Sequence, residues 1–336
     1  MSDFNQFLKV LRRETPDYPV LFELFMNRPL YEYALQKAGK SFDNSDYYST
    51  MVSTAYAFEA LGYDYATVHG LMRFETGNSQ HGDTISLNDG TMITDRESFE
   101  RYQWPDPYSY DYSAFDKIKS DMSNGMKLMI MGPGGVLENV ISLMGFDNMC
   151  LALYDDEQLV WDVFEQVGKR LVGYYKEALK YESVGVVMSN DDWGFNTQTM
   201  ISIENMQKYT FPWHTEIVKT AHSSGRPVLL HSCGNFSKII PDLIDLKYDA
   251  RHSYEDNIIP VEQAYDMLIG NMAVLGGMDV DFLIRSEVGD IRTRVTDMLN
   301  KTGGKGYAVG SGNSVPEYIP LEKYYAMIDA AKSIRL

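Results

Sequence analysis

The sequence has few cysteines and a shortage of positive charge. Its 336 residues include two cysteines, Cys150 and Cys233, which excludes a disulfide-stabilised scaffold and favours a reducing compartment. Lysine and arginine total 30, against 47 aspartate and glutamate residues, so the formal net charge is −17. Nucleic acids and anionic membranes are bound through basic surfaces, and this balance therefore argues against both as partners.

Long apolar segments are also missing. No stretch reaches the roughly 18 apolar residues of a membrane-spanning helix, and residues 1–13 lack the apolar core of a signal peptide. We therefore expect a cytoplasmic protein. Hydrophobic residues still make up 44% of the chain, which is enough for a large core and excludes extensive disorder.

The chain has no linker-like segment, so we expect one domain over residues 1–336, with an irregular insertion around residues 77–112. Apolar runs of strand length recur at 20–26, 65–69, 127–131, 184–189, 227–231, 250–254, 273–275 and 306–309. Amphipathic stretches of helical length lie between most of them, as at 157–181, 211–223 and 316–332. This alternation predicts an α/β fold, a single (β/α)8 barrel with an N-terminal helical extension. A doubly wound sheet is the alternative, although it would need a glycine-rich phosphate turn after an early strand.

Polar side chains follow most of the predicted strands. In a (β/α)8 barrel the active site lies at the carboxyl ends of the strands. These ends carry His69, Asp191, Asp192, Trp193, His231, Cys233, Glu255, Asp279, Ser311 and Asn313. We therefore predict a polar pocket at the barrel mouth, with five of these residues in contact with substrate: His69, Trp193, Asp279, Ser311 and Asn313.

His231 and Cys233 are two residues apart at the end of a predicted strand, and such residues point to the same side of an extended chain. An imidazole and a thiolate in this position can bind one Zn²⁺ ion. Glu255 ends the neighbouring predicted strand, and its carboxylate can complete a ligand set with one open position, as in catalytic zinc sites. The alternative is a buried cysteine that packs as a small hydrophobic side chain beside a structural histidine.

Asp191 and Asp192 end the strand before His231. Adjacent residues on a strand point to opposite faces, so at most one of these carboxylates faces the pocket. We predict that it acts in catalysis, either by positioning substrate or by orienting His231 through a hydrogen bond. The other carboxylate would cap the following loop.

With these residues in view, the chain resembles the uroporphyrinogen decarboxylase superfamily, most strongly from about Asp155 to the C-terminus. The matching strings are Asn190-Asp191-Asp192-Trp193-Gly194, His231-Ser232-Cys233-Gly234-Asn235, Gly276-Gly277-Met278-Asp279 and Gly310-Ser311-Gly312-Asn313-Ser314. The resemblance implies a (β/α)8 barrel. The family contains the decarboxylases themselves and zinc enzymes that move methyl groups to or from corrinoid proteins, among them the methylcobalamin:coenzyme M methyltransferases and some O-demethylase methyltransferases.

The resemblance separates these two branches at the N-terminus. The decarboxylases have an arginine-rich signature there that binds substrate carboxylates. The similar stretch here, residues 22–28, keeps one arginine, Arg28, and includes Glu23. This departure argues against uroporphyrinogen as the substrate. The position of the stretch still implies that Glu23 and Asn27 contact substrate.

The methyltransferase branch keeps the His-x-Cys pair, which His231 and Cys233 match. The cobalamin-independent methionine synthases, similar in fold, add a glutamate at the position of Glu255. The coenzyme M enzymes have a second cysteine where Ser311 stands, so either Glu255 completes the zinc site or the site has lost its metal. The resemblance implies a zinc-assisted transfer of a methyl group between a methyl ether or thiol and cobalamin carried by a partner corrinoid protein. The alternatives are a metal-free decarboxylase that uses Asp192 and a catalytically silent barrel that binds a tetrapyrrole or corrinoid.

Overall fold

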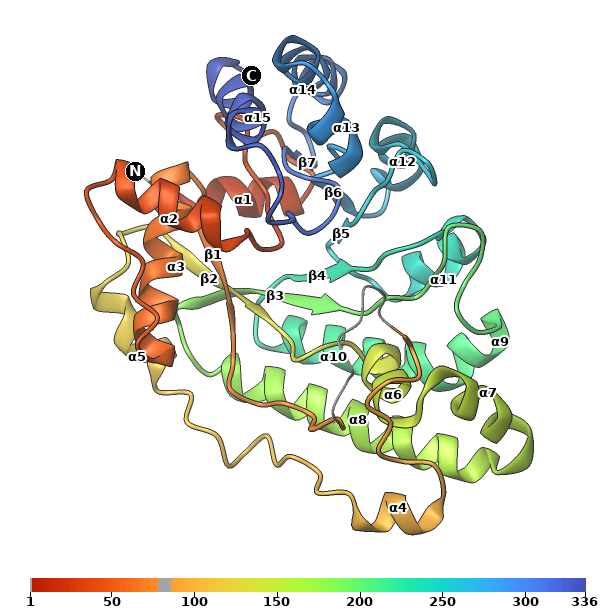
Figure 1. Ribbon diagram of the computed structural model, residues 1–336. Helices are drawn as coiled ribbons and strands as arrows, with labels where there is room; N and C mark the ends of the chain where they lie inside the picture. Colours follow the sequence, from red (N-terminus) through yellow and green to blue (C-terminus); the bar gives the residue numbers. More distant parts are fainter. Residues whose placement is uncertain (1, 78–85) are drawn as a thin grey trace.

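The computed structural model of the chain describes residues 2–77 and 86–336 and shows an α/β fold built on a curled parallel sheet (Figure 1). The seven strands pair in chain order and are β1 Tyr65–His69, β2 Lys127–Met131, β3 Val184–Asn190, β4 Val228–His231, β5 Ala250–His252, β6 Ala273–Leu275 and β7 Tyr307–Ala308. The helices are α1 Phe4–Leu11, α2 Arg28–Lys37, α3 Tyr47–Leu61, α4 Arg96–Arg101, α5 Ala114–Lys117, α6 Val136–Met144, α7 Phe146–Asp155, α8 Glu157–Ala178, α9 Ile203–Asn205, α10 Phe211–Ser223, α11 Ile240–Asp245, α12 Val261–Leu268, α13 Val280–Arg285, α14 Val288–Thr302 and α15 Leu321–Ser333.

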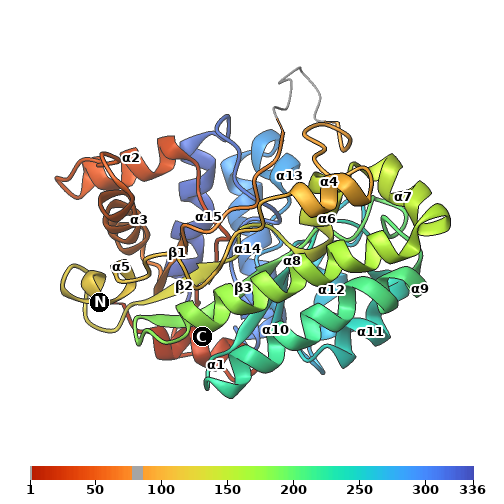
Figure 2. The same cartoon turned by 90° about the horizontal axis from the view of Figure 1, so that it is seen from below.

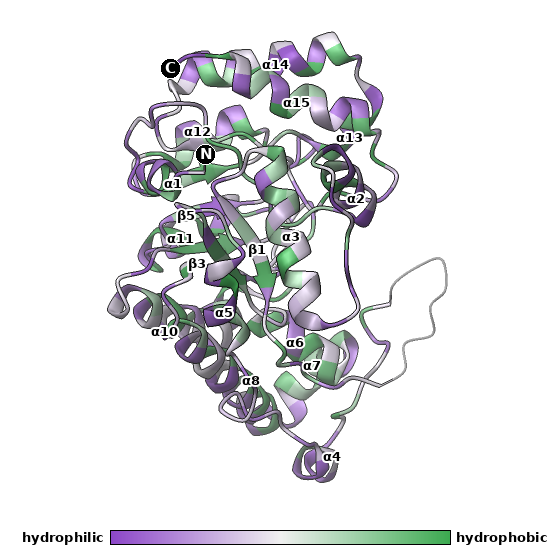
Figure 3. Cartoon of the chain, turned by 90° about the vertical axis from the view of Figure 1, so that its left-hand side faces the viewer, coloured by the Kyte–Doolittle hydropathy of each residue, from purple (hydrophilic) through white to green (hydrophobic). Residues whose placement is uncertain are grey.

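Most strand residues are buried and apolar, because helices pack against the curled sheet. All seven residues of β3 are buried, as expected for a parallel strand between two packed layers. Helix α3 packs against β1, α10 against β3 and β4, and α12 against β6. Figure 2 shows α8 and α10 running side by side across the outside of the molecule. In Figure 3 these helices carry both purple and green residues, whereas the short α4 is mostly purple.

The predicted eight-stranded barrel is present only in part, because residues 20–26 do not form a strand. This segment makes a single parallel bridge, between Leu21 and Val309. On its other side the Tyr65 hydroxyl lies 2.7 Å from both the amide nitrogen and the carbonyl oxygen of Glu23. A side chain of β1 therefore occupies the backbone groups that a strand would need for pairing with β1.

The other predicted elements lie close to the observed ones. Strand β5 ends at His252, two residues before the predicted end. The amphipathic stretch 316–332 becomes a helix only from Leu321, because Pro320 stands at its N-cap. Within the predicted insertion 77–112, the described part contains helix α4, and residues 78–85 lie outside the described residues.

Among the described helices, none is by itself both long and apolar enough to cross a membrane. Helices α6 and α7 meet the length and composition criteria only when taken together, across a bend of 91°.

Candidate metal and active site

Strand register brings the candidate residues together. Asn190 at the end of β3 lies beside His231 at the end of β4, and His231 lies beside His252 at the end of β5. Residues two apart share a side of an extended chain, which accounts for Asp192 and Cys233 coming together. The carboxyl ends of these strands thus form one edge with several polar side chains.

Asp192, His231 and Cys233 form the core of this edge. One ligand atom from each lies within 4.8 Å of the others. His231 Nε2 is 3.6 Å from Cys233 Sγ, and Asp192 Oδ1 accepts a hydrogen bond from the Cys233 amide at 3.1 Å. The group therefore offers one nitrogen, one sulfur and one oxygen donor, and its carboxylate is that of Asp192 rather than that of Glu255.

Glu255 lies next to this group. The side-chain nitrogen of Asn313, Nδ2, is 3.3 Å from Cys233 Sγ and 3.2 Å from Glu255 Oε1, so this side-chain amide contacts both the sulfur and the carboxylate. Glu255, Asn313 and Asp279 also line an adjoining cavity of about 760 Å³. A cavity of this size is typical of small-molecule sites.

Burial controls the protonation of the two principal donors. It raises the pKa of the Cys233 thiol to about 12, and the nearby Asp192 carboxylate adds to the shift. It also holds the pKa of His231 well below its usual value. Without a cation, the pair is therefore a neutral thiol beside a neutral imidazole. A bound cation would favour the thiolate, because it offsets the cost of burying that charge.

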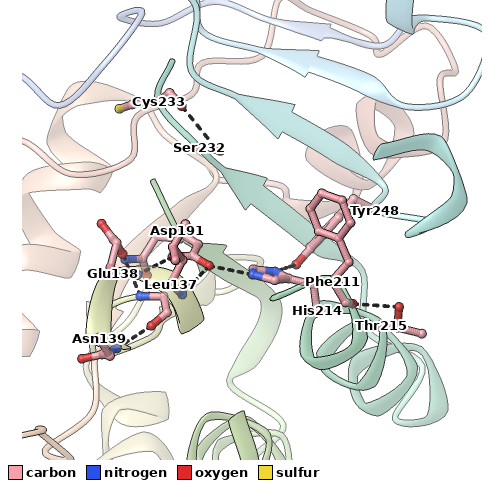
Figure 4. A network of polar contacts seen from close by, with 12 residues as sticks. Leu137, Glu138, Asn139, Asp191, Phe211, His214, Thr215, Ser232, Cys233 and Tyr248 are labelled. Atoms are coloured by element: carbon pink, nitrogen blue, oxygen red, sulfur yellow. Dashed lines mark hydrogen bonds and ion pairs between the residues drawn. The ribbon is translucent and has the colours of Figure 1, made fainter. Parts of the chain in front are cut away.

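Asp191 points away from this group into a second network, shown in Figure 4. Its carboxylate accepts hydrogen bonds from the backbone amides of Leu137 and Glu138 at the start of α6, at 3.0 and 2.9 Å. His214 Nε2 lies 2.8 Å from Asp191 Oδ2, and His214 Nδ1 lies 2.6 Å from the Tyr248 hydroxyl. Asp191 and His214 are both fully buried, so this network ties α6 and α10 to the end of β3.

Glu138 is a further residue of this site that the strand-end pattern did not predict. Its carboxylate accepts hydrogen bonds from the Gly135 amide at 2.7 Å and from the Asn190 side chain at 3.1 Å. Burial, with the charges of Asp191 and Asp192 nearby, raises the pKa of Glu138 to about 8. The sequence signal is a glutamate three residues after the glycine that precedes an apolar helix, which is typical of a helix N-terminus.

Two predicted substrate contacts, Glu23 and Ser311, are fully buried and bind each other. Glu23 Oε1 accepts a hydrogen bond from the Ser311 amide at 2.9 Å, and Glu23 Oε2 is 2.6 Å from the Ser311 hydroxyl. Asn27 caps α2 and donates to the Pro316 carbonyl, and Asp279 caps α13. All four residues thus make contacts within the protein, and of the four only Asp279 also lines the adjoining cavity. Their role in substrate binding stays a prediction.

The last two predicted substrate contacts are Trp193 and His69. Trp193 is buried against Phe211 and His214, and its indole nitrogen has no hydrogen-bond partner among the described residues. His69 lines a second cavity of about 570 Å³ together with Arg73. Burial and the Arg73 charge lower the pKa of His69 to about 4, so its imidazole is neutral at physiological pH.

Comparison with known proteins identifies the family of the chain and a similar fold. The family model of uroporphyrinogen decarboxylase (URO-D) matches residues 3–334, so the chain belongs to this family. A solved structure of a methyltransferase from Methanosarcina mazei superposes with a TM-score of 0.71 at 14% identity, over 98% of this chain and 97% of that chain. A B12-independent methionine synthase from Shewanella sp. W3-18-1 gives 0.45 at 12% identity, over 62% and 61%. No curated protein matches the chain by sequence.

Proposed function

We propose that this member of the uroporphyrinogen decarboxylase family is a zinc-dependent methyltransferase. It would move a methyl group between a small methyl ether or thiol and cobalamin carried by a partner corrinoid protein. The observation that carries the proposal is the group of nitrogen, sulfur and oxygen donors from Asp192, His231 and Cys233 at the carboxyl edge of the sheet. The similarity in fold to a protein described as a methyltransferase supports the same class of reaction.

The donor set suits zinc. Zn²⁺ binds cysteine sulfur, histidine nitrogen and carboxylate oxygen, and catalytic sites have three protein ligands with one open position. Mg²⁺ and Ca²⁺ prefer oxygen ligands, so the cysteine argues against them. One thiolate and one carboxylate would neutralise the ion. Glu255 is the alternative carboxylate ligand in place of Asp192, because the side-chain amide of Asn313 contacts both Glu255 Oε1 and Cys233 Sγ.

When bound, zinc would supply Lewis acidity, which lowers the pKa of a thiol or polarises a methyl ether oxygen. The residues of the chain bind and orient. Asp192 holds the backbone at Cys233, and the Asn313 amide donates toward the sulfur. The adjoining cavity, lined by Glu255 and Asn313, would receive the small substrate.

The N-terminal stretch does not support decarboxylation of uroporphyrinogen. Glu23 is fully buried against Ser311, and Arg28 forms an ion pair with Glu32 at 2.6 Å. We therefore expect no measurable conversion of uroporphyrinogen to coproporphyrinogen by the purified protein. Detection of that product would move the protein to the decarboxylase branch.

The central test is metal binding. Zinc would be titrated against a chromogenic chelator with the wild type, Cys233→Ser and Cys150→Ser at one pH. We expect one zinc per wild-type chain and a loss of affinity of about 100-fold or more in Cys233→Ser, because that substitution removes the sulfur ligand. Cys150 lies on α7, outside the donor group, and its substitution should leave the affinity unchanged.

Activity would be measured with free methylcobalamin as the methyl donor and 2-mercaptoethanol as the acceptor, by the absorbance change on demethylation. The zinc-loaded wild type should accelerate the reaction, and Cys233→Ser should not. Equal zinc binding by the wild type and Cys233→Ser would contradict the proposal and favour the metal-free alternatives.

A further inference from the structure

His231 and His252 contact each other through equivalent nitrogen atoms. They are register partners on β4 and β5, and His231 Nδ1 lies 2.8 Å from His252 Nδ1. The other nitrogen of His252, Nε2, lies 3.0 Å from the carbonyl oxygen of Ser311. The other nitrogen of His231, Nε2, faces Cys233 Sγ. The two rings therefore form a row of hydrogen-bond contacts that begins at the Ser311 carbonyl and ends at the candidate metal donors.

The N–H hydrogens of the two rings can be assigned by starting from the Ser311 carbonyl. A carbonyl oxygen only accepts hydrogen bonds, so His252 carries its hydrogen on Nε2. In a neutral imidazole the second nitrogen is then an acceptor. His252 Nδ1 must accept from His231, which places the hydrogen of His231 on Nδ1. The lone pair of His231 is left on Nε2, the nitrogen that faces Cys233.

The surroundings of His252 require a neutral ring. Its side chain is fully buried, and the centroid of its ring lies 5.1 Å from that of the Phe22 ring. The preceding residue, Arg251, is also buried, and its guanidinium donates to the carbonyls of Ser253 and Ser232. A charged His252 would add a second buried cation next to Arg251. Among the described residues, no carboxylate forms an ion pair with the ring of His252 or of His231, so this charge would be costly.

A glycine permits the contact between His252 and Ser311. Gly276 has φ = +72°, and a Cβ atom there would lie 2.2 Å from the Ser311 carbonyl oxygen and 3.0 Å from His252 Cδ2. The same carbonyl accepts from the Gly277 amide at 3.0 Å. The acceptor that sets the orientation of His252 is thus held by backbone at the end of β6.

We propose that His252 is a positioning residue that fixes His231 in the Nδ1–H tautomer, so that Nε2 is available as a metal donor before the metal arrives. The strand-end pattern offered Asp191 or Asp192 as a residue that orients His231, but these carboxylates bind His214 and the Cys233 backbone amide instead. The inference rests on the proposed zinc site, and its tautomer is measurable without metal.

The test reads the tautomers directly. Long-range ¹H–¹⁵N correlation spectra of the full-length, metal-free protein, labelled at its six histidines, distinguish Nδ1–H from Nε2–H rings. We expect Nδ1–H for His231 and Nε2–H for His252. Observation of Nε2–H on His231 in the wild type would overturn the inference, whether or not the protein binds zinc.

Two substitutions separate positioning from packing. His252→Phe keeps an aromatic ring but removes the acceptor, so His231 should lose its tautomer preference and zinc affinity should fall by about 10- to 100-fold. His252→Asn offers a side-chain oxygen near the position of Nδ1, and it should restore the tautomer and most of the affinity. His222→Phe, at an exposed histidine paired with Asp249, is the control and should change neither.

The outcomes remain distinguishable. If His252→Phe does not fold, the wild-type spectrum and His252→Asn still decide the inference. Equal affinities for His252→Phe and His252→Asn would overturn the positioning role. Absence of zinc binding by a wild type with the expected tautomers would overturn the proposed function instead.

Discussion

Burial favours the protonated form of the Glu23 carboxyl group, which lies against the Ser311 hydroxyl. The Ser311 Oγ atom lies 2.6 Å from Glu23 Oε2 and 2.6 Å from the Asn313 carbonyl oxygen. The hydroxyl has one hydrogen and faces two acceptors, so it cannot donate fully to both. A protonated Glu23 resolves this conflict, because it can donate its own hydrogen to Ser311 Oγ while the hydroxyl donates to the Asn313 carbonyl. This agrees with burial, which raises the pKa of Glu23 to about 8.

Glu23 should therefore make the stability depend on pH. Between the unfolded pKa of about 4.5 and the folded pKa of about 8, the unfolded chain has lost this proton and the folded chain has kept it. The free energy of unfolding should fall as pH rises through this window, by up to about 1.4 kcal/mol per pH unit for one such group. Glu23→Gln removes this contribution, so its slope should be shallower.

The measurement is urea unfolding of the wild type and Glu23→Gln at several pH values from 5 to 8. Glu138 also has a raised pKa and contributes in the same direction, so Glu138→Gln provides a second comparison. An unchanged slope in Glu23→Gln would show that Glu23 is ionised in the folded protein.

At the scale of secondary-structure elements, Asp191 and Asp192 have separate tasks although they are adjacent. Asp191→Ala would leave the amides at the start of α6 and the Nε2 atom of the buried His214 without a partner, and should lower the free energy of unfolding by about 3–5 kcal/mol. Asp192→Ala removes a half-buried donor of the metal group, and should weaken zinc binding with a much smaller loss of stability. Urea unfolding and the chelator competition, run on both variants, measure the two effects. The reverse pattern would contradict the assignment.

The alternation of side chains along a strand could be predicted from the sequence, and it correctly placed these two carboxylates on opposite sides. Which of them faces Cys233 could not be predicted, because that depends on the register between β3 and β4 and on where α6 packs. The same limit applies to His252. Strand register determines that His231 is the neighbour of His252. The contact between His252 and Ser311 joins residues that are 59 positions apart in the sequence.

Most strands of the sheet were predictable because they are short apolar runs between helical segments, although β5 carries Arg251 and His252. The run at 20–26 has the same composition but forms one bridge, since the Tyr65 hydroxyl occupies the backbone of Glu23. An apolar composition predicts that a segment is buried. It does not predict whether a neighbouring side chain binds the backbone groups that strand pairing needs. The predicted residues His231 and Cys233 meet at the edge of the sheet, whereas Glu138 lies on a helix start that strand patterns do not reach.

At the scale of the whole molecule, the metal group joins parts of the chain that only folding brings together. Asp192 follows β3, His231 and Cys233 belong to the end of β4, and Asn313 follows β7. The unfolded chain has no preformed site, so zinc should bind the folded state preferentially and stabilise it by mass action. At a free concentration 100 times the dissociation constant, the gain is about 2.7 kcal/mol.

Zinc-loaded wild-type protein should therefore unfold at higher urea concentration than the same protein treated with a chelator. Cys150→Ser should show the same difference, because its thiol lies on α7 away from the donors. Cys233→Ser should show almost none, since the group then lacks its sulfur and holds zinc too weakly to be saturated. The comparison uses each variant as its own reference, so any stability lost by the substitution itself cancels. The contrary outcome is a zinc-loaded wild type that holds one zinc per chain but has the same unfolding midpoint as the chelator-treated protein. The ion would then be bound outside this fold-dependent group, and the assignment of Asp192, His231 and Cys233 as its ligands would be wrong.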